Sequence, residues 1–325
     1  MPGEREAYLA ALPAEHEYVF SDVKLTSSSL ESARGAEIIS VFVGSMLTAQ
    51  MIDTLPGLKL ICTRSMGYDH IDVKHAKEKG IKVTNVTSYA AHPVAEFTFA
   101  LLLAVTRKIY YAYNQLREGT DYDIRDLQGV SLNGRTFGVV GTGRIGKNVA
   151  LLAKAFGMNV LINDAKPDET WSSQNGLSYI PLDDLLSQAD IVSIHVPYMP
   201  ETHHLMNAER FAKMKMGSIL INTSRGEIVE THALLAALKE GRLWGAGLDV
   251  LEEERALKEE IDVIVGERPN IDYELLTANH VLIDHPRVIV TPHIAFSTDE
   301  AMREITRVTA LAISDYLDGR EIQSL

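Results

Sequence analysis

Cysteine is nearly absent from this chain of 325 residues, with Cys62 as its single representative. One thiol excludes an intramolecular disulfide and a metal site built from several thiolates. Positive charge is also scarce, because 31 lysines and arginines face 44 aspartates and glutamates, and the net charge is −13 at pH 7. This balance argues against a surface that binds nucleic acid or an anionic membrane, since both need a basic face. An anionic substrate would have to be bound by a local cation.

Long apolar runs are missing too. No run approaches the ~20 residues that cross a bilayer, and the opening Met-Pro-Gly-Glu-Arg-Glu lacks the pattern of a signal peptide. We therefore expect a cytoplasmic protein without a membrane span. Apolar residues still make up 46% of the chain and charged residues 23%, which permits a sizeable core. The length indicates about two domains.

The most informative stretch runs from Arg135 to Asp164. A short apolar strand leads into Gly141, Gly143 and Gly146 in a G-x-G-x-x-G pattern, and an amphipathic helix and a second strand follow. The first glycine permits a tight turn, the second lets the backbone approach a pyrophosphate, and the third allows close packing of helix on strand. The acid that ends the second strand suits a ribose 2′-hydroxyl, which favours NAD over NADP. An ordinary strand–turn–helix connection is the alternative, but the complete ordered context favours dinucleotide binding.

The rest of the chain alternates between strand and helix patterns, which predicts parallel sheets and an α/β fold. One long apolar helix is expected over Val94–Tyr113, with Pro93 at its start, and a charged irregular segment over Glu252–Asn279. The other predicted strands are Tyr18–Phe20, Ile38–Val43, Leu58–Cys62, Ile81–Asn85, Asp190–His195, Ser218–Asn222, Trp244–Val250 and Val288–Val290. The other predicted helices are Glu4–Leu12, Leu30–Arg34, Thr48–Leu55, Val73–Lys79, Leu182–Gln188, Asn207–Met214, Glu230–Glu240 and Thr298–Leu317.

Three polar segments directly follow predicted strands, where doubly wound sheets bind their ligands. They are His195-Val-Pro, Thr223-Ser-Arg225-Gly and the run from Asp249 to Glu254. Arg225 suits a carboxylate clamp because its planar guanidinium binds bidentately and stays charged, and it can stabilise negative charge on a carbonyl oxygen. A surface arginine is the alternative, which the position after an apolar strand disfavours.

Six segments follow one another as they do in the D-2-hydroxyacid dehydrogenases: NVTSYAAHPVAE, GVVGTGRIG, SIHVPYMPET, LINTSRGEIV, GAGLDVLEEE and TPHIAF. The chain resembles this family over nearly its whole length. It looks most like the D-lactate dehydrogenase branch. The features that say so are the Ser88-Tyr89 pair, Phe296 three residues after His293, and the long acidic insertion between Glu254 and His293.

The resemblance implies two doubly wound parallel-sheet domains. A Rossmann NAD-binding domain over residues 91–295 would be inserted into a flavodoxin-like substrate domain made of residues 1–90 and 296–325. Substrate domains of this family begin with a β-strand, whereas this sequence begins with a helix pattern. Unless another element covers the exposed sheet edge, we expect the chain to be less stable and less active. The resemblance also implies a homodimer formed through the NAD-binding domain.

The same resemblance assigns catalysis to Arg225, Glu254 and His293. Histidine suits the acid–base role because it titrates near neutral pH, and Pro292 fixes the backbone before His293. Glu254 would hydrogen-bond the other ring nitrogen, hold the tautomer and favour the protonated ring. Only the register of the family selects Glu254 from its run of three glutamates, for which a solvated acidic surface is the alternative.

The resemblance further implies which residues contact NAD and the substrate. The residues implied for NAD are Gly141, Gly143, Arg144, Ile145, Gly146, Asp164, His195, Val196, Pro197, Thr202, Thr223, Ser224, Arg225, Asp249, His293 and Ala295. The residues implied for the substrate are Met66, Gly67, Tyr89, Arg225, His293 and Phe296. Met66 and Gly67 would act through backbone groups, whereas Tyr89 and Phe296 would enclose the substrate side chain and leave a small apolar pocket. His195 would have only a supporting part, on the cofactor side.

A metal site is not expected. The histidine pairs His203-His204 and His280/His285 have no carboxylate or cysteine at ligand spacing.

These observations predict NAD-dependent reduction of a 2-keto acid to the D-2-hydroxy acid, with pyruvate and D-lactate as the preferred pair. One alternative is another D-2-hydroxyacid dehydrogenase, acting on a bulkier 2-keto acid or on hydroxypyruvate. A second alternative is an NADH-sensing binding protein, because some corepressors resemble this family. The acidic net charge and the lack of additional tails disfavour that second alternative.

Overall fold

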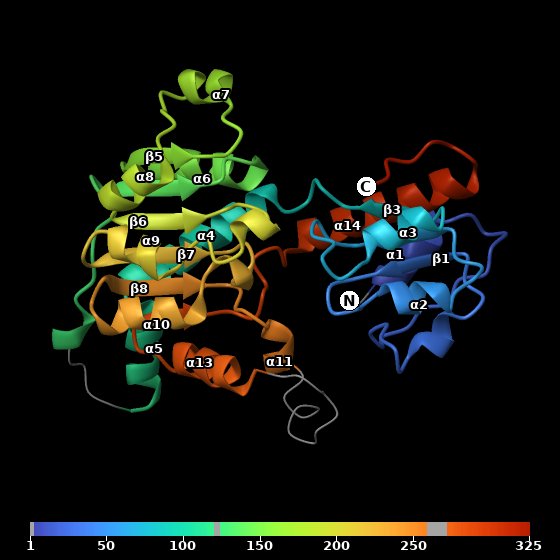
Figure 1. Ribbon diagram of the computed structural model, residues 1–325, viewed down its shortest axis with the longest axis horizontal. Helices are drawn as coiled ribbons and strands as arrows, with labels where there is room; N and C mark the ends of the chain where they lie inside the picture. The colour runs from blue at the N-terminus through green and yellow to red at the C-terminus, as the bar shows by residue number, and fades with distance from the viewer. Residues whose placement is uncertain (1–2, 120–123, 259–271) are drawn as a thin grey trace. The chain divides into compact units, whose positions relative to one another are not determined.

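The computed structural model describes residues 3–119, 124–258 and 272–325. Two compact units divide the chain, Met1–Ala90 with Ser297–Leu325 and Ala91–Phe296, and we describe each by itself (Figure 1). The sequence boundary expected after residue 295 falls one residue later in this division. Each unit contains a parallel sheet with helices, so the predicted α/β class is confirmed.

The first unit contains a three-stranded parallel sheet in the order β1-β2-β3. Its strands are β1 (Ile38–Val41), β2 (Leu60–Thr63) and β3 (Lys82–Asn85), and its helical segments are α1 (Glu4–Ala11), η1 (Leu30–Ala33), α2 (Ala49–Asp53), α3 (Val73–Glu78) and α14 (Asp299–Leu317). The central strand β2 is buried on both faces because successive side chains point in opposite directions. Leu60 and Cys62 pack with Ile313 of α14, whereas Ile61 packs with Ile52 of α2 and Ala76 of α3.

The end of the chain also belongs to this first unit. The backbone N–H of Leu325 donates to the carbonyl oxygen of Val83 at 2.8 Å, so the last residues lie beside β3. The strand predicted at Tyr18–Phe20 is wrong, because those residues form no regular structure. Val19 is 78% exposed there, and Phe20 instead lies beside the ring of Tyr8. No neighbouring strand pairs with this segment in the described part of the unit, so its β propensity has nothing to stabilise it.

The second unit contains six parallel strands in the order β5-β4-β6-β7-β8-β9. They are β4 (Thr136–Val140), β5 (Asn159–Asn163), β6 (Ile191–Ile194), β7 (Ser218–Asn222), β8 (Leu243–Leu248) and β9 (Val288–Val290). The chain passes from β4 outward to β5 and then returns to β6 on the other side of β4. Such a reversal opens a crevice at the carboxyl ends of the strands, where doubly wound sheets bind their ligands.

Helices cover both faces of this sheet, which explains why every residue of β6 and β7 is buried (Figure 1). The helices of this unit are α4 (Ala91–Thr106), α5 (Ile109–Arg117), α6 (Arg144–Ala155), α7 (Glu169–Gln174), α8 (Leu182–Gln188), α9 (Ala208–Lys213), α10 (Thr231–Lys239), α11 (Glu254–Lys258) and α13 (Tyr273–Ile283), of which α7 projects beyond β5. Short 3₁₀ turns are η2 (Arg125–Leu127), η3 (Pro200–Thr202) and η4 (Gly226–Ile228). None of the helices in the described ranges is long and apolar enough to cross a membrane.

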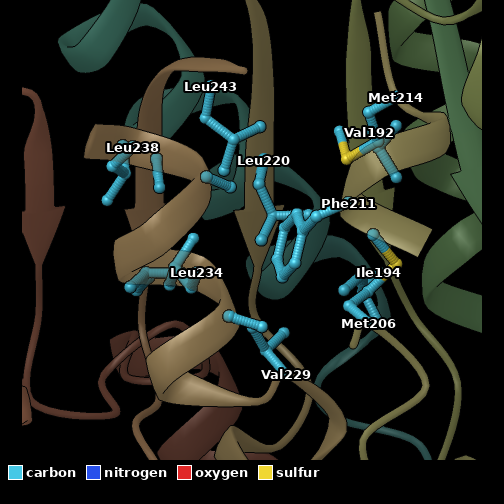
Figure 2. Packing of buried hydrophobic residues seen from close by; sticks show 14 of the residues in the cluster. Val192, Ile194, Met206, Phe211, Met214, Leu220, Val229, Leu234, Leu238 and Leu243 are labelled. Atoms are coloured by element: carbon cyan, nitrogen blue, oxygen red, sulfur yellow. The ribbon is translucent and has the colours of Figure 1, made fainter. Parts of the chain in front are cut away.

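Alternation along β7 separates two apolar cores. Ile219 and Ile221 pack on the side of α4 and α6, whereas Leu220 packs on the side of α9 and α10. Figure 2 shows the second of these cores, with the ring of Phe211 from α9 beside Leu220. These two layers hold the strands in register and so fix where their carboxyl ends lie.

The single helix predicted over Val94–Tyr113 is wrong, because α4 and α5 are separate helices. Lys108 lies between them with a left-handed φ of 51°. The carbonyl oxygen of Thr106 accepts a hydrogen bond from the N–H of Val130 at 2.9 Å instead of continuing the helix. A side chain at Gly129 would overlap that carbonyl, so the approach of this segment depends on glycine. A contact between residues far apart in sequence therefore ends α4.

The charged segment over Glu252–Asn279, predicted to be irregular, contains helical residues in its described parts. Glu254–Lys258 form α11, and α13 begins at Tyr273 with Asp272 as its cap, whose carboxylate accepts from the N–H of Leu275 at 2.9 Å. The part of this prediction that covers residues 259–271 lies outside the described residues. The helix α7 was not predicted either, although Asp168 caps it in the same way.

Candidate active site

The glycine loop lies at the carboxyl end of β4, beside the reversal in strand order. Gly141 has a left-handed φ of 94°, and a Cβ there would lie 2.7 Å from the carbonyl carbon of His195, which follows β6. A Cβ on Gly146 would overlap the carbonyl oxygen of Gly141. Both positions therefore require glycine, one for the turn and one for the close approach of α6 to the strand.

Gly143 differs from these two glycines because no heavy atom lies within 4 Å of the position its Cβ would take. It is the N-cap of the twelve-residue helix α6 and offers no side chain to cap it. The N–H groups at the start of a helix have no partner within the helix and lie at the positive end of its dipole, and in α6 they belong to Arg144, Ile145 and Gly146. This arrangement fits a pyrophosphate, and the residues of the loop are those that would hold it.

Asp164 follows β5 and lies beside this loop. One carboxylate oxygen accepts from the N–H of Thr142 at 2.6 Å and from its hydroxyl at 3.0 Å. The other accepts from the N–H of Lys166 at 2.8 Å. A carboxylate has about four acceptor sites, so it can still accept a hydroxyl of a ribose. The carboxylate is therefore oriented at the edge of the loop, as cofactor binding would require.

His195 follows β6, and its Nε2 lies 2.8 Å from the hydroxyl oxygen of Ser193. The residue keeps some exposed surface, but protein atoms surround the imidazole and this desolvation lowers the pKa of His195 to about 3. The ring is neutral at physiological pH, so it is unsuited to proton transfer there. Val196 and Pro197 continue the segment, and the hydroxyl of Thr202 donates to the carbonyl oxygen of Pro197 at 2.7 Å.

The turn after β7 presents Arg225. Asn222 organises this turn, because its side chain accepts from the N–H of Ser224 at 3.0 Å and donates to the carbonyl oxygen of Arg225 at 2.9 Å. The guanidinium of Arg225 donates to the carbonyl oxygen of Ser224 at 2.7 Å, and the hydroxyl oxygen of Thr223 lies 3.1 Å from that of Thr98 in α4. Sequence reasoning missed Asn222, although a buried amide at the end of an apolar strand is a usable signal.

Asp249 organises a second turn, which carries His293. Its carboxylate accepts from the hydroxyl of Thr291 at 2.6 Å and from the N–H groups of Ile294 and Ala295 at 3.0 and 2.8 Å. The residue is fully buried, and this burial raises the pKa of Asp249 against the opposing effect of those hydrogen bonds. The carboxylate thus holds the polypeptide on both sides of His293.

His293 has a left-handed φ of 58°, which few residues with a side chain adopt. Its N–H donates to the carbonyl oxygen of Asp249 at 2.8 Å, and its Nδ1 lies 2.8 Å from a carboxylate oxygen of Glu254. The side chains of His293 and Glu254 are 20% and 28% exposed, so the pair is partly shielded but open to a ligand. The ring of Phe296 lies nearly perpendicular to the imidazole, with the ring centroids 6.5 Å apart. The Nε2 atom is the ring nitrogen left to act on a substrate.

Close backbone packing brings Arg225 toward this pair. A side chain at Gly226 would overlap the carbonyl group of Leu251, so only glycine lets the two turns meet. The next residue is Glu227, whose pKa is affected by charged side chains from both turns. Burial raises its pKa and the charge of Glu254 raises it further, whereas Arg225 opposes the shift. The three residues assigned to catalysis are therefore gathered at one edge of the second sheet.

A family model for the NAD-binding domain of D-isomer-specific 2-hydroxyacid dehydrogenases matches residues 99–295. The chain belongs to this family. It is 39% identical over 304 residues to D-lactate dehydrogenase kk1H of Curvularia clavata. The match covers 92% of this chain and 84% of the relative. It is 38% identical over 296 residues to a glyoxylate reductase of Thermofilum pendens, covering 89% of this chain and 81% of the relative.

A solved structure of D-lactate dehydrogenase from Aquifex aeolicus, complexed with NAD and lactic acid, gives a TM-score of 0.86 at 37% identity. The match covers 98% of this chain and 92% of that one. The resemblance to the D-lactate dehydrogenase branch is confirmed, and the chain is an NAD-dependent dehydrogenase of 2-hydroxy acids.

The remaining residues predicted to bind substrate in this dehydrogenase lie in the first unit. The N–H of Met66 donates to the hydroxyl of Tyr89 at 3.3 Å, and the carbonyl oxygen of Met66 accepts from Asn85 at 2.8 Å. The carbonyl oxygen of Gly67 accepts from Ser65 at 2.7 Å. Phe296 belongs to the second unit, and the role of Met66, Gly67 and Tyr89 in substrate binding stays a prediction.

Among the described residues, no group of three or more histidine, cysteine, aspartate or glutamate side chains is arranged to hold a metal ion. The rings of His203 and His204 stack with centroids 3.9 Å apart, and His204 pairs with Glu252.

Proposed function

We propose that this enzyme reduces pyruvate to D-lactate with NADH as the electron donor. The observation that carries the proposal is the pairing of His293 Nδ1 with Glu254 at 2.8 Å, in the unit where Gly226, next to Arg225, packs against Leu251. A carboxylate at this nitrogen fixes the tautomer and leaves Nε2 facing the substrate. The relatives named D-lactate dehydrogenases support the choice of pyruvate.

The residues of the chain have distinct parts in this reaction. When bound, NADH supplies the hydride that reduces the carbonyl carbon. Arg225 binds the carboxylate with its planar guanidinium and stabilises the charge that develops on the carbonyl oxygen. His293 donates the proton from Nε2 to that oxygen, and solvent then restores it, so one proton is consumed for each D-lactate formed. Glu254 stabilises the protonated imidazole.

The proposed preference for a small side chain rests on the aromatic residues. The ring of Phe296 lies beside the acting imidazole, where a bulky substituent on the 2-keto acid would meet it. Tyr89 is the second aromatic expected to limit the pocket. We expect smaller residues at Tyr89 or Phe296 to shift the preference toward larger 2-keto acids.

The test is NADH oxidation with pyruvate, 2-ketobutyrate, phenylpyruvate, hydroxypyruvate and glyoxylate side by side, with the configuration of the product determined enzymatically. Fast turnover of pyruvate to the D-isomer is the expected result. A folded sample that binds NADH but turns over none of the five acids would contradict the proposal and favour the NADH-sensing alternative.

Glyoxylate or hydroxypyruvate is the second candidate substrate. It is favoured by two relatives named glyoxylate reductases, which are 38% and 40% identical to this chain over 296 and 228 residues. A kcat/KM for glyoxylate above that for pyruvate would decide for this candidate.

The selectivity for NADH over NADPH is assigned to Asp164. Its carboxylate stands beside the glycine loop and would repel a 2′-phosphate. We expect Asp164→Ser to lower kcat/KM with NADH and raise it with NADPH, by about tenfold each. Equal use of both cofactors by the unaltered enzyme would contradict this role.

We also propose a homodimer formed through the second unit. Helix α5 exposes Ile109, Tyr110, Tyr113 and Leu116, each at least half exposed. These four side chains on one short helix form an exposed apolar patch, and such patches mark protein–protein contacts. Light scattering should give twice the chain mass of 35.9 kDa, and Tyr110→Asp with Tyr113→Asp should halve it. A monomer from the unaltered chain at micromolar concentration would contradict the proposal.

A further inference from the structure

A second histidine–glutamate pair lies in the same unit as the first. The Nε2 of His204 lies 2.6 Å from one carboxylate oxygen of Glu252. The other oxygen accepts from the N–H of Thr231, at the start of α10, also at 2.6 Å. The carbonyl oxygen of Glu252 accepts from the side chain of Asn279 in α13 at 2.8 Å. Glu252 is only 7% exposed, so its charge is compensated by partners rather than by water.

These contacts tie one residue to three segments that are distant in sequence. A buried carboxylate held by two donors cannot move without leaving one of them unsatisfied, which is costly in a protein interior. On the preceding side, Leu251 is packed against Gly226 with no room for a side chain. The main chain at residues 251–252 is therefore fixed on both sides.

Glu254 follows only two residues later, and the residue between them is strained. Glu253 has a left-handed φ of 49°, a conformation that residues with a side chain adopt only when their surroundings impose it. Because Glu252 is anchored and Glu253 is forced into this conformation, the chain is turned so that Glu254 begins α11 and reaches His293. The buried pair of His204 and Glu252 thus supports the partly exposed pair of His293 and Glu254.

We infer that Glu252 is a positioning residue for the acid–base pair, and that its anchors His204 and Thr231 hold Glu254 at Nδ1 of His293. The inference rests on the proposed function for the role of His293 in proton transfer, but the positioning itself is a structural claim. Other charged groups near these residues are Glu227 and Arg225, which the test must leave unchanged.

The deciding measurement is nuclear magnetic resonance of the full-length protein labelled with ¹⁵N-histidine. Glu252→Gln keeps the size of the side chain but replaces one of its two acceptor oxygens by a donor. We expect the ring nitrogens of His293, assigned from His293→Asn, to shift in the same direction as in Glu254→Gln. Glu253→Gln removes an equal charge from an exposed neighbour and should leave the ring signals of His293 unchanged. Unchanged His293 signals in folded Glu252→Gln, with altered signals from His204, would overturn the inference.

Kinetics give an independent readout. We expect Glu252→Gln to lower kcat for pyruvate reduction by about tenfold, with the Kd for NADH within about twofold of the unaltered enzyme. Added to Glu254→Gln, the same change should lower kcat by less than about twofold, because the partner it positions is gone. If Glu252→Gln lowered kcat tenfold both in the unaltered enzyme and in Glu254→Gln, the positioning role would be overturned. If Glu252→Gln does not fold, His204→Ala removes one anchor and is read in the same way.

The proposed function and the positioning role of Glu252 can be tested separately. If the unaltered enzyme reduces no 2-keto acid, the proposed function fails, and the histidine signals still decide whether Glu252 positions Glu254.

Discussion

Two histidines follow strands at the same edge of the second sheet, and their surroundings suit them to opposite parts. His195 is surrounded by protein, has only the hydroxyl of Ser193 at its Nε2, and its pKa is lowered to about 3. His293 is partly exposed, has the carboxylate of Glu254 at its Nδ1, and stands on a strained backbone held by Asp249. The difference shows that position after a strand selects candidates, whereas the partner and the solvation of the ring decide which of them can exchange a proton.

The largest expected effect comes from removing the acting ring. His293→Asn should lower kcat for pyruvate reduction by about 10²–10⁴-fold, the usual contribution of a general acid. NADH binding, followed by fluorescence, should stay within about twofold. The matched change His195→Asn should lower kcat far less, and equal losses in the two variants would break the comparison.

The next effect concerns stability in acid. His195 is neutral in the folded chain down to about pH 3, whereas an unfolded histidine binds a proton below about pH 6.5. The unfolded state therefore holds more protons between these values, and folding stability should fall as the pH is lowered through this window, by up to roughly 1.4 kcal/mol per pH unit. Urea unfolding at pH 7, 5.5 and 4.5 should show a weaker dependence in His195→Gln. The exposed control His16→Gln should keep the dependence of the unaltered chain, and an unchanged slope in His195→Gln would contradict this account.

Glu254→Gln should act on the proton donor. Reduction needs the protonated imidazole, which the carboxylate at Nδ1 stabilises, so the neutral amide should lower kcat/KM for pyruvate by about tenfold. The measurement is steady-state NADH oxidation at pH 7. Glu253→Gln is the control of equal charge, and a loss of activity only in the control would identify the wrong glutamate.

The smallest effect concerns the strained backbone that distinguishes the surroundings of His293. Glu253→Gly should relieve the left-handed φ of 49° and raise the free energy of unfolding by about 0.5–1 kcal/mol, measured by thermal melting. Glu118→Gly makes the same change at an exposed residue with an ordinary φ of −78° and should destabilise. Equal destabilisation by both would show that Glu253 is not under strain.

The sequence alone predicted the elements whose signals are local. The strand Ser218–Asn222, the strand Val288–Val290 and the helix Leu182–Gln188 have the bounds expected from apolar patterns and flanking polar residues. The dinucleotide fingerprint is equally local, because Gly141 answers to a turn and Gly146 to a contact with Gly141 only five residues earlier. Family, fold class and NAD as cofactor could therefore be predicted from the residues.

Tertiary structure decided what depends on distant neighbours. The break between α4 and α5 arises because Val130 takes the carbonyl oxygen of Thr106, and the strand expected at Tyr18–Phe20 fails for want of a partner. The parts of Asn222, Asp249 and Glu252 likewise depend on hydrogen bonds to groups that only folding brings near. A sequence pattern shows which side chains can do chemistry, but the desolvation and the partners that tune them are properties of the packed molecule.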